Sequence, residues 1–270
     1  MLSVTIVLSL VIPFATGELY RRTDLSLVNA APCLEQPLDL SACLSAPLGY
    51  NELGQNLAVR LAKATQTTLV IGFAAVIIIV TLGVLVGSVA GYVGGRTDNL
   101  LMRLVDVILS LPFLFLILLI VSLFGLRDVR VIVIALGITG WTTAARLIRG
   151  EFLSIRETDY VQAARALGVG HRRIITRHML PGAMAPLVVA AALGVADSVI
   201  IESALSFLGF GVAPPEVSLG QMLNNANQYF FRHPERIFYP GVALVTIVLC
   251  ASFLGDGMRD ALDPRQRIEG

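Results

Sequence analysis

Long apolar segments without charge restrict the folds open to this chain more than any other feature of its sequence. Residues 65–91 contain no charged side chain, and apolar segments of similar character recur along the chain. A helix of about 20 apolar residues crosses a bilayer, because it satisfies its backbone hydrogen bonds internally. Only 14% of the residues are charged, whereas soluble domains average about 25%. The chain is therefore predicted to be an all-α polytopic membrane protein.

Six transmembrane helices are predicted, over residues 2–17, 65–91, 101–125, 129–149, 182–205 and 237–255. The first could instead be a cleaved signal peptide, because "PFATG" resembles a small-residue cleavage site. No basic region precedes it, which favours a retained first helix within residues 1–17. Residues 18–64 then form an external loop, and residues 65–267 contain the other five helices. Pro112 is expected to kink the third helix, since proline removes a backbone donor.

The arginines predict the orientation of these helices. With both termini in the cytoplasm, the inside segments contain more arginine than the longer outside segments, as the positive-inside rule requires. Cys33 and Cys43 then lie in the external loop, where oxidising conditions permit a disulfide. Two unpaired thiols are the alternative.

Neither a catalytic site nor a metal site is recognisable in the sequence. The only lysine, Lys63, follows Ala62, so the chain lacks the Gly-Lys-Ser/Thr of a phosphate-binding loop. Metalloprotease and nucleophile-elbow motifs are absent, and no two histidines lie in facing apolar segments. The net charge of +1 gives no indication of nucleic-acid binding. We expect no cofactor in this chain and no enzymatic activity of its own.

One polar, arginine-rich segment, "DYVQAARALGVGHRRIITRHMLPG", interrupts the apolar pattern. Asp159 is predicted to begin a helix in a capping box with Gln162, and Gly168 to end it in a left-handed conformation. A second helix is predicted over residues 171–180, until Pro181 resets the chain.

Small side chains on the first of these helices allow another surface to approach closely, and they are Ala163, Ala164 and Ala166. Tyr160, Val161 and Leu167 add apolar contacts beside them. The helix is therefore expected to fit a cleft on a partner protein. The alternative is a surface loop whose arginines contact anionic lipid headgroups.

The same segment resembles the EAA loop of ABC importer permeases. The matching residues are Ala163, Ala164, Gly168, Leu180 and Pro181, while Gln162 stands where the motif has glutamate. The resemblance is narrowed to one class of permease by three other stretches: "LMRLVDVILSLP" (101–112), "ESALSFLGFGVAPP" (202–215) and "LGDGMRDALDPR" (254–265). Together they are similar to the C-type permease subunit of dipeptide/oligopeptide (and nickel) ABC transporters, over residues 48–267. The stretch "PLGYNELGQN" (47–56) departs from the acidic and arginine pattern of that family.

This resemblance implies a type I ABC importer permease fold in a bacterial inner membrane. The chain would form half of a translocation pore with a homologous second permease. Two ATP-binding subunits would supply ATP and Mg, and an extracytoplasmic peptide-binding protein would deliver the cargo. Within the loop at residues 150–181, the ATPase-coupling helix would use Asp159, Tyr160, Gln162, Ala163, Ala164, Leu167, Gly168, Arg172 and Arg173.

Charged residues inside the predicted spans are costly and therefore indicate function. Asp197, Ser198 and Glu202 are candidates for lining the pore, although structural pairing with a neighbouring helix is the alternative. Arg103 and Asp106 are three residues apart, which favours an intrahelical ion pair. The external segment at residues 206–236 could cap the pore or lie at the membrane interface.

Import of short peptides is the function that we expect from these patterns. The same architecture carrying nickel complexes or glutathione is one alternative. A proton-coupled carrier with a relay through Asp106, Asp197 and Glu202 is another, and it would need no groove on a partner. Replacement of Ala164 by tryptophan should therefore uncouple an ATP-driven importer but not such a carrier.

Overall fold

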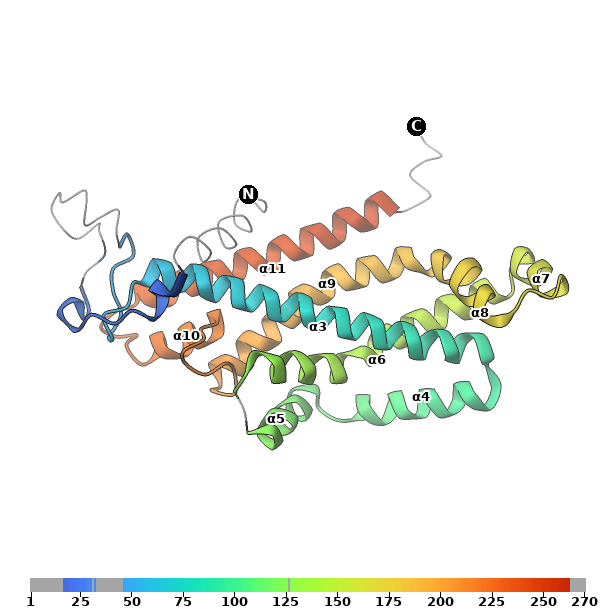
Figure 1. The fold of residues 1–270 in the computed structure, drawn as a ribbon, viewed down its shortest axis with the longest axis horizontal. Helices are drawn as coiled ribbons and strands as arrows, with labels where there is room; N and C mark the ends of the chain where they lie inside the picture. Colours follow the sequence, from blue (N-terminus) through green and yellow to red (C-terminus); the bar gives the residue numbers. More distant parts are fainter. Residues whose placement is uncertain (1–16, 31, 33–45, 126, 263–270) are drawn as a thin grey trace. The chain divides into compact units, whose positions relative to one another are not determined.

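Helices make up all of the regular structure in the part of the chain that the computed structural model describes (Figure 1). That part comprises residues 17–30, 32, 46–125 and 127–262. It confirms the predicted all-α fold. The predicted helix at residues 2–17, both external cysteines and the end of the tail motif lie outside the described residues, apart from Gly17.

Four of the described helices are long and apolar enough to cross a membrane. They are α3 (Leu57–Val93), α6 (Val129–Arg156), the continuous helix His171–Phe207 that contains α9 (Leu180–Phe207), and α11 (Glu235–Leu262). Each contains one predicted span and extends beyond it. The extensions carry the charged and polar residues that hydropathy alone assigns to loops.

The third predicted span is not one helix. It consists of α4 (Gly95–Ser110) and α5 (Phe113–Phe124), whose axes are bent by 88° at Leu111 and Pro112 (Figure 1). Both linking residues have extended backbones, and proline disfavours a helical conformation in the residue before it. The kink at Pro112 is therefore confirmed, but the continuous helix over 101–125 is wrong. The pair counts as a fifth span only if it crosses the membrane as a broken helix.

The chain divides into two compact units, and α3, α9 and α11 run from one unit into the other. One unit comprises the described residues up to Ile71, residues 127–129 and Glu202–Ile247. The other comprises residues 72–125, 130–201 and 248–262. The second unit contains α4, α5 and most of α6, together with the polar loop that follows α6.

Glycines bring α3 and α6 into close contact inside this second unit. A Cβ atom on Gly87 would lie 2.9 Å from Ile148 Cβ, and one on Gly91 would lie 2.6 Å from Phe152 Cβ. Gly83 meets Ala144 in the same way, four residues earlier on α3. Small residues at a spacing of four let helix backbones approach closely where no hydrophobic effect drives their association. The α3–α6 contact is therefore a backbone-to-backbone packing surface.

Two ion pairs connect α4 to α6. Arg149 contacts both carboxylate oxygens of Asp98, at 2.5 and 2.7 Å, and Arg146 contacts Asp106 at 2.5 Å. The predicted pairing of Asp106 with Arg103 is therefore wrong, because the neighbouring helix presents a closer guanidinium. A cluster of Val105, Trp141 and Ala145 packs beside these pairs.

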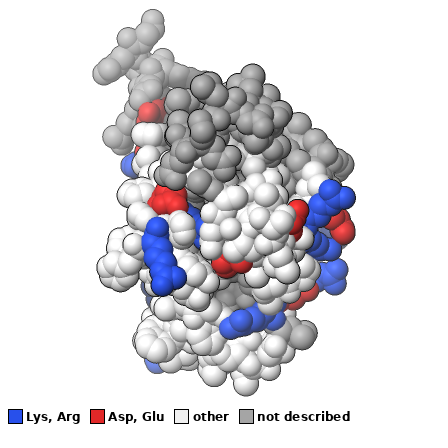
Figure 2. Space-filling view, turned by 90° about the vertical axis from the view of Figure 1, so that its left-hand side faces the viewer, with Lys and Arg blue, Asp and Glu red and all other residues white. Residues whose placement is uncertain are grey.

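The first unit contains α10 (Leu219–Asn227) and two short 3₁₀ helices, Gly17–Arg21 and Leu25–Leu27. Arg236 donates to Asn29 Oδ1 at 2.8 Å and to the Tyr50 carbonyl at 3.1 Å. These bonds hold residues 47–56, the stretch whose sequence departs from the acidic and arginine pattern of the similar permeases. Arg21 pairs with Glu216 at 3.1 Å beside Tyr20, and burial raises the pKa of the Tyr20 hydroxyl. On the face drawn in Figure 2, blue and red atoms lie mixed in small groups between neutral areas.

Candidate coupling helix and membrane cavity

The polar loop begins where α6 ends, and its first helix is α7 (Asp159–Ala166). The residue that caps α7 is Thr158 rather than Asp159, and its hydroxyl donates to the Ile155 carbonyl at 2.6 Å instead of capping the helix. Gln162 Nε2 donates to the Glu157 carbonyl at 3.1 Å. The predicted capping box is therefore wrong, because Asp159 is the first residue of the helix and Thr158 is its N-cap. Gln162 still ties the first turn to the chain before it.

Gly168 ends α7 as predicted. Its φ is +74°, and its N–H donates to the Arg165 carbonyl at 3.0 Å. Val169 N–H donates to the Ala164 carbonyl at 3.1 Å. These two bonds form a Schellman motif, in which a left-handed residue satisfies the last carbonyls of a helix. The reversal of the chain after α7 is therefore held by the backbone.

Proline does not reset the chain after the second short helix. Residues His171–Arg173 form α8, Ile174–Met179 form a π-helical turn, and α9 continues from Leu180 through Pro181. The Leu180 N–H donates to the Ile175 carbonyl, five residues back. A π turn rearranges the backbone bonds ahead of a residue that has no N–H, so the helix can pass through the proline. The predicted break at Pro181 is wrong.

The face that α7 turns toward its own chain is not the expected one. Ala164 is only 7% exposed and packs with Val161 in a cluster that includes Phe152 and Met179. Ala163 is exposed. Ala166 is exposed as well. The prediction that all three alanines lie on the partner-facing surface is therefore wrong for Ala164, which fills a site in the core of the second unit.

An apolar stripe remains exposed on α7. Tyr160 is 49% exposed and Leu167, which follows the helix, is 83% exposed. Ala163 lies between them at helical spacing, three residues from the first and four from the second. We call these three residues the α7 stripe. Asp159 and Gln162 are exposed at its side, and Arg172 and Arg173 are exposed farther along the loop.

Tyr92, near the end of α3, joins the polar loop in a way that the sequence did not reveal. Its hydroxyl lies 2.6 Å from His171 Nδ1, and the Arg165 guanidinium lies over its ring, 5.1 Å from the centroid. The only signal for this role is an aromatic residue with a polar end at the edge of an apolar span. The polar loop therefore touches α3 directly as well as continuing from α6 and into α9.

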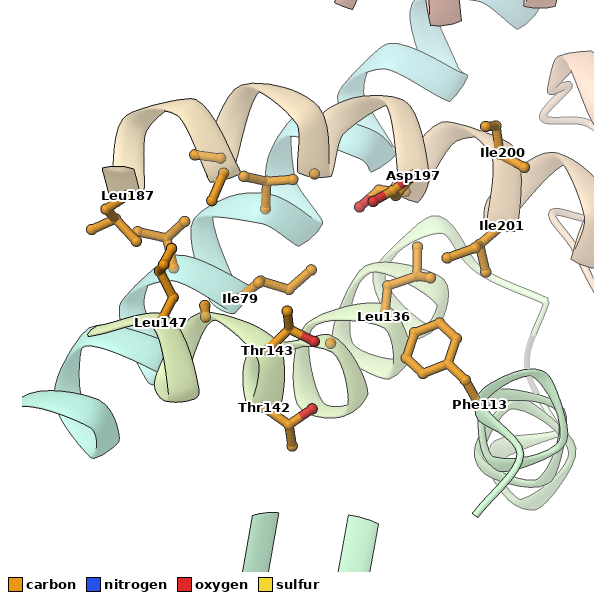
Figure 3. A pocket seen from close by; sticks show the side chains of 18 of the residues that line it. Ile79, Phe113, Leu136, Thr142, Thr143, Leu147, Leu187, Asp197, Ile200 and Ile201 are labelled. Carbon is orange, nitrogen blue, oxygen red and sulfur yellow. The ribbon is translucent and has the colours of Figure 1, made fainter. Parts of the chain in front are cut away.

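A cavity of about 470 Å³ lies in the second unit, between α9 and α6 (Figure 3). Its walls are mostly apolar, with Phe113 of α5 and Leu136 of α6 among them. Asp197 and Thr143 project from α9 and α6 into this space (Figure 3). Ser198 also lines the cavity, and its side chain is almost fully buried.

Glu202 has a different environment from Asp197, although both belong to α9. It is 0% exposed, and its carboxylate accepts hydrogen bonds from Ser206 at 2.6 Å and Thr68 at 3.2 Å. Thr68 Oγ1 in turn accepts the backbone N–H of Leu219 at 3.1 Å, and Ser218 donates to Ser206 at 3.1 Å. Among the described residues, Glu202 is therefore an anchor for the start of α10 and does not line the cavity. Structural pairing with a neighbouring helix was the predicted alternative for Glu202, and this arrangement matches it.

The described residues contain no group of three or more His, Cys, Asp or Glu side chains that could hold a metal ion. What the second unit does present is an exposed apolar stripe on a short polar loop and a membrane cavity with one carboxylate. Both features lie on or beside the helix that runs from His171 to Phe207.

Comparison with known proteins identifies the same architecture. Residues 83–268 match the family described as "Binding-protein-dependent transport system inner membrane component". The chain is 36% identical, over 98% of its length and 83% of the relative, to the oligopeptide transport system permease protein OppC of Haemophilus influenzae. It is 37% identical, over 81% of its length and 68% of the relative, to the dipeptide transport system permease protein DppC of Bacillus subtilis.

A solved structure of the MetNI methionine ABC transporter in an inward-facing conformation has a TM-score of 0.64 to this chain. The identity is 22%, over 77% of this chain and 98% of that chain, so this likeness bears on the fold alone. Family match and relatives agree with the described helices, which make the protein a multi-pass membrane protein. Subunits of this kind work with ATPase and substrate-binding partners. The chain therefore belongs to the family of binding-protein-dependent transport system inner membrane components, the permease subunits of ABC importers.

Proposed function

We propose that this chain forms half of a translocation pore for dipeptides or oligopeptides. The relatives named for oligopeptide and dipeptide transport support this cargo. The observation that carries the proposal is the exposed α7 stripe, because an apolar surface on a polar loop gains stability only when a partner covers it. The cavity between α9 and α6, of about 470 Å³, has the size of sites that bind small ligands, roughly 300–1,000 Å³.

The proposed assembly contains a homologous second permease, two ATP-binding subunits and an extracytoplasmic peptide-binding protein. ATP and Mg belong to the ATP-binding subunits, and this chain holds no cofactor. Both termini lie in the cytoplasm, because the arginines of the polar loop then face inward. The α7 stripe seats in a groove of one ATP-binding subunit.

Closure of the ATP-binding subunits moves α7 in this mechanism. The contact of Tyr92 with His171 passes that movement to α3, and the continuous helix from His171 passes it to the cavity wall. Gating of this kind is rigid-body motion of helices around a site within the membrane. The side chains of this chain bind and orient the partners and perform no bond-breaking step.

The test is ATP-dependent uptake of a labelled tripeptide by the reconstituted complex. Leu167→Asp places a charge on the most exposed apolar residue of the α7 stripe, and we expect it to abolish both binding of the ATP-binding subunit and uptake. Leu25→Asp is the matched control, since Leu25 is 76% exposed on the external segment and lies outside the polar loop. It should leave both measurements unchanged.

Full coupling in Leu167→Asp would contradict the docking role of α7. Uptake that follows a proton gradient without ATP would contradict the importer itself and favour a proton-coupled carrier.

A further inference from the structure

Asp197 is the one charged side chain among the described residues that line the membrane cavity. Its neighbours in the wall are aliphatic, aromatic or hydroxyl side chains, such as Ile201, Phe113 and Thr143. The carboxylate projects into the open space rather than back toward α9 (Figure 3). A cavity of otherwise neutral walls therefore has a single negative group, placed where an occupant would contact it.

This carboxylate has no hydrogen-bond or ion-pair partner among the described residues. Three other carboxylates in or near the apolar helices do have partners within the chain. Asp98 and Asp106 pair with arginines of α6, and Glu202 is surrounded by hydroxyl groups. A charge inside a membrane span is costly and is retained where it pairs or marks a substrate pathway. Within the described residues, Asp197 is therefore open to pair with a charged group on an occupant of the cavity.

We propose that Asp197 acts as a charge filter in the pore, favouring cargo that carries a basic side chain over cargo that carries an acidic one. This inference rests on the proposed peptide-import function and names the preferred class of peptide. The chemistry recognised is a protonated amine or guanidinium. Every peptide cargo has an α-ammonium group, so discrimination arises from the side chains.

The walls of the cavity strengthen this preference. Coulomb attraction grows as the effective dielectric falls, and the apolar walls lower it beside a carboxylate that is itself exposed and so open to an occupant. The aliphatic part of a lysine or arginine side chain can lie against Leu136 and Ile201 while its charged end reaches Asp197. An acidic side chain in the same place meets a like charge without a compensating donor. The filter thus combines an attraction with a repulsion, as specific sites commonly do.

The experiment compares uptake of Ala-Lys-Ala, Ala-Ala-Ala and Ala-Glu-Ala by the complete reconstituted importer at saturating peptide. Saturation loads the binding protein fully, so that differences arise at the permease. Asp197→Asn should lower the ratio of lysine-peptide to glutamate-peptide uptake about tenfold, equivalent to about 1.4 kcal/mol. Asp197→Glu should retain the ratio. Asp106→Asn removes a charge outside the cavity wall and should also leave the ratio unchanged.

Three other outcomes have distinct meanings. An unchanged ratio in Asp197→Asn, with normal uptake of Ala-Ala-Ala, would overturn the charge filter while leaving peptide import intact. An equal loss of all three peptides would also overturn it, because the carboxylate would then pair with a partner subunit. Failure of the unmodified complex to take up any peptide would contradict the proposed function and, with it, the basis of the filter.

Discussion

Gly87 provides the sharpest test of the contact between α3 and α6. A Cβ atom at this position would lie 2.5 Å from the Ala145 carbonyl oxygen and 2.9 Å from Ile148 Cβ. Nonbonded carbon atoms prefer separations of about 3.5–4.0 Å, so Gly87→Ala must push the two helices apart locally. Overpacking of this kind costs about 1–3 kcal/mol, while alanine regains at most about 1 kcal/mol of helix propensity. With the full propensity gain subtracted, we expect a net loss of up to about 2 kcal/mol from these terms, and about 1–3 kcal/mol relative to a glycine-to-alanine change without a close contact.

Trp141 makes the measurement possible. It is the only tryptophan in the chain, is 7% exposed and packs in a cluster with Ala145, the residue that Gly87 contacts. Its fluorescence should report loss of the α3–α6 contact when the purified chain in detergent micelles is titrated with sodium dodecyl sulfate. The midpoint of unfolding for Gly87→Ala should shift to a lower concentration of sodium dodecyl sulfate than that of the unmodified chain.

Gly150→Ala is the matched control, because Gly150 lies on α6 with no atom within 4 Å of an added Cβ. Its midpoint should stay unchanged or rise slightly, since only the propensity of the helix changes. If Gly87→Ala is as stable as Gly150→Ala, the close contact does not exist in the protein and the packing argument fails.

Three further changes test other contacts. Ala164→Trp should destabilise the polar loop by about 3 kcal/mol or more because it overfills a closed core site, and limited proteolysis should then cut this loop faster. In a double-mutant cycle, Asp98→Asn and Arg149→Gln should couple by about 1–2 kcal/mol in the same fluorescence titration, and independent effects would refute the ion pair. Glu202→Leu leaves buried hydroxyls without an acceptor and should cost about 2–4 kcal/mol. Hydrogen exchange at the Leu219 amide should accelerate in that variant, and unchanged protection would contradict the anchoring of α10.

The outcome for Ala164 also corrects the experiment suggested by the sequence. Tryptophan at this position disrupts the core of the second unit in an importer and in a carrier alike, so it cannot distinguish them. An eight-residue helix with alanines on two of its faces has no periodicity that tells which face is buried. Leu167, with its large exposed side chain, distinguishes the two mechanisms instead.

The spans could be predicted because a bilayer imposes its own length on apolar helices, and residues 65–91 meet that requirement without help from neighbours. The 88° bend could be predicted only in part. Pro112 marks its position, but the angle depends on where α4 is held by Asp98 and Asp106. Asp106 likewise pairs with Arg146 and not with Arg103 because α6 lies beside α4, and the spacing of residues along one helix does not reveal its neighbour.

Within the candidate site, the sequence indicated Asp197 because a charge in an apolar segment is conspicuous. It could not separate Asp197 from Glu202, since both are carboxylates on one helix. What separates them is a set of hydroxyls contributed by Thr68 and Ser206, one of which lies far away in the chain. Tyr92 was missed for the same reason, because its partners in the polar loop are distant in sequence.

The π turn at Ile174–Met179 has a consequence for the angular alignment of the two ends of its helix. One additional residue in a turn rotates everything beyond it by about 100° relative to an uninterrupted α-helix. The direction in which Asp197 points around the helix axis, relative to the α7 stripe, therefore depends on the one additional residue in the π turn. Deleting one residue from this turn would leave both surfaces chemically intact, yet a carboxylate aimed at the cavity would be turned to another side of α9.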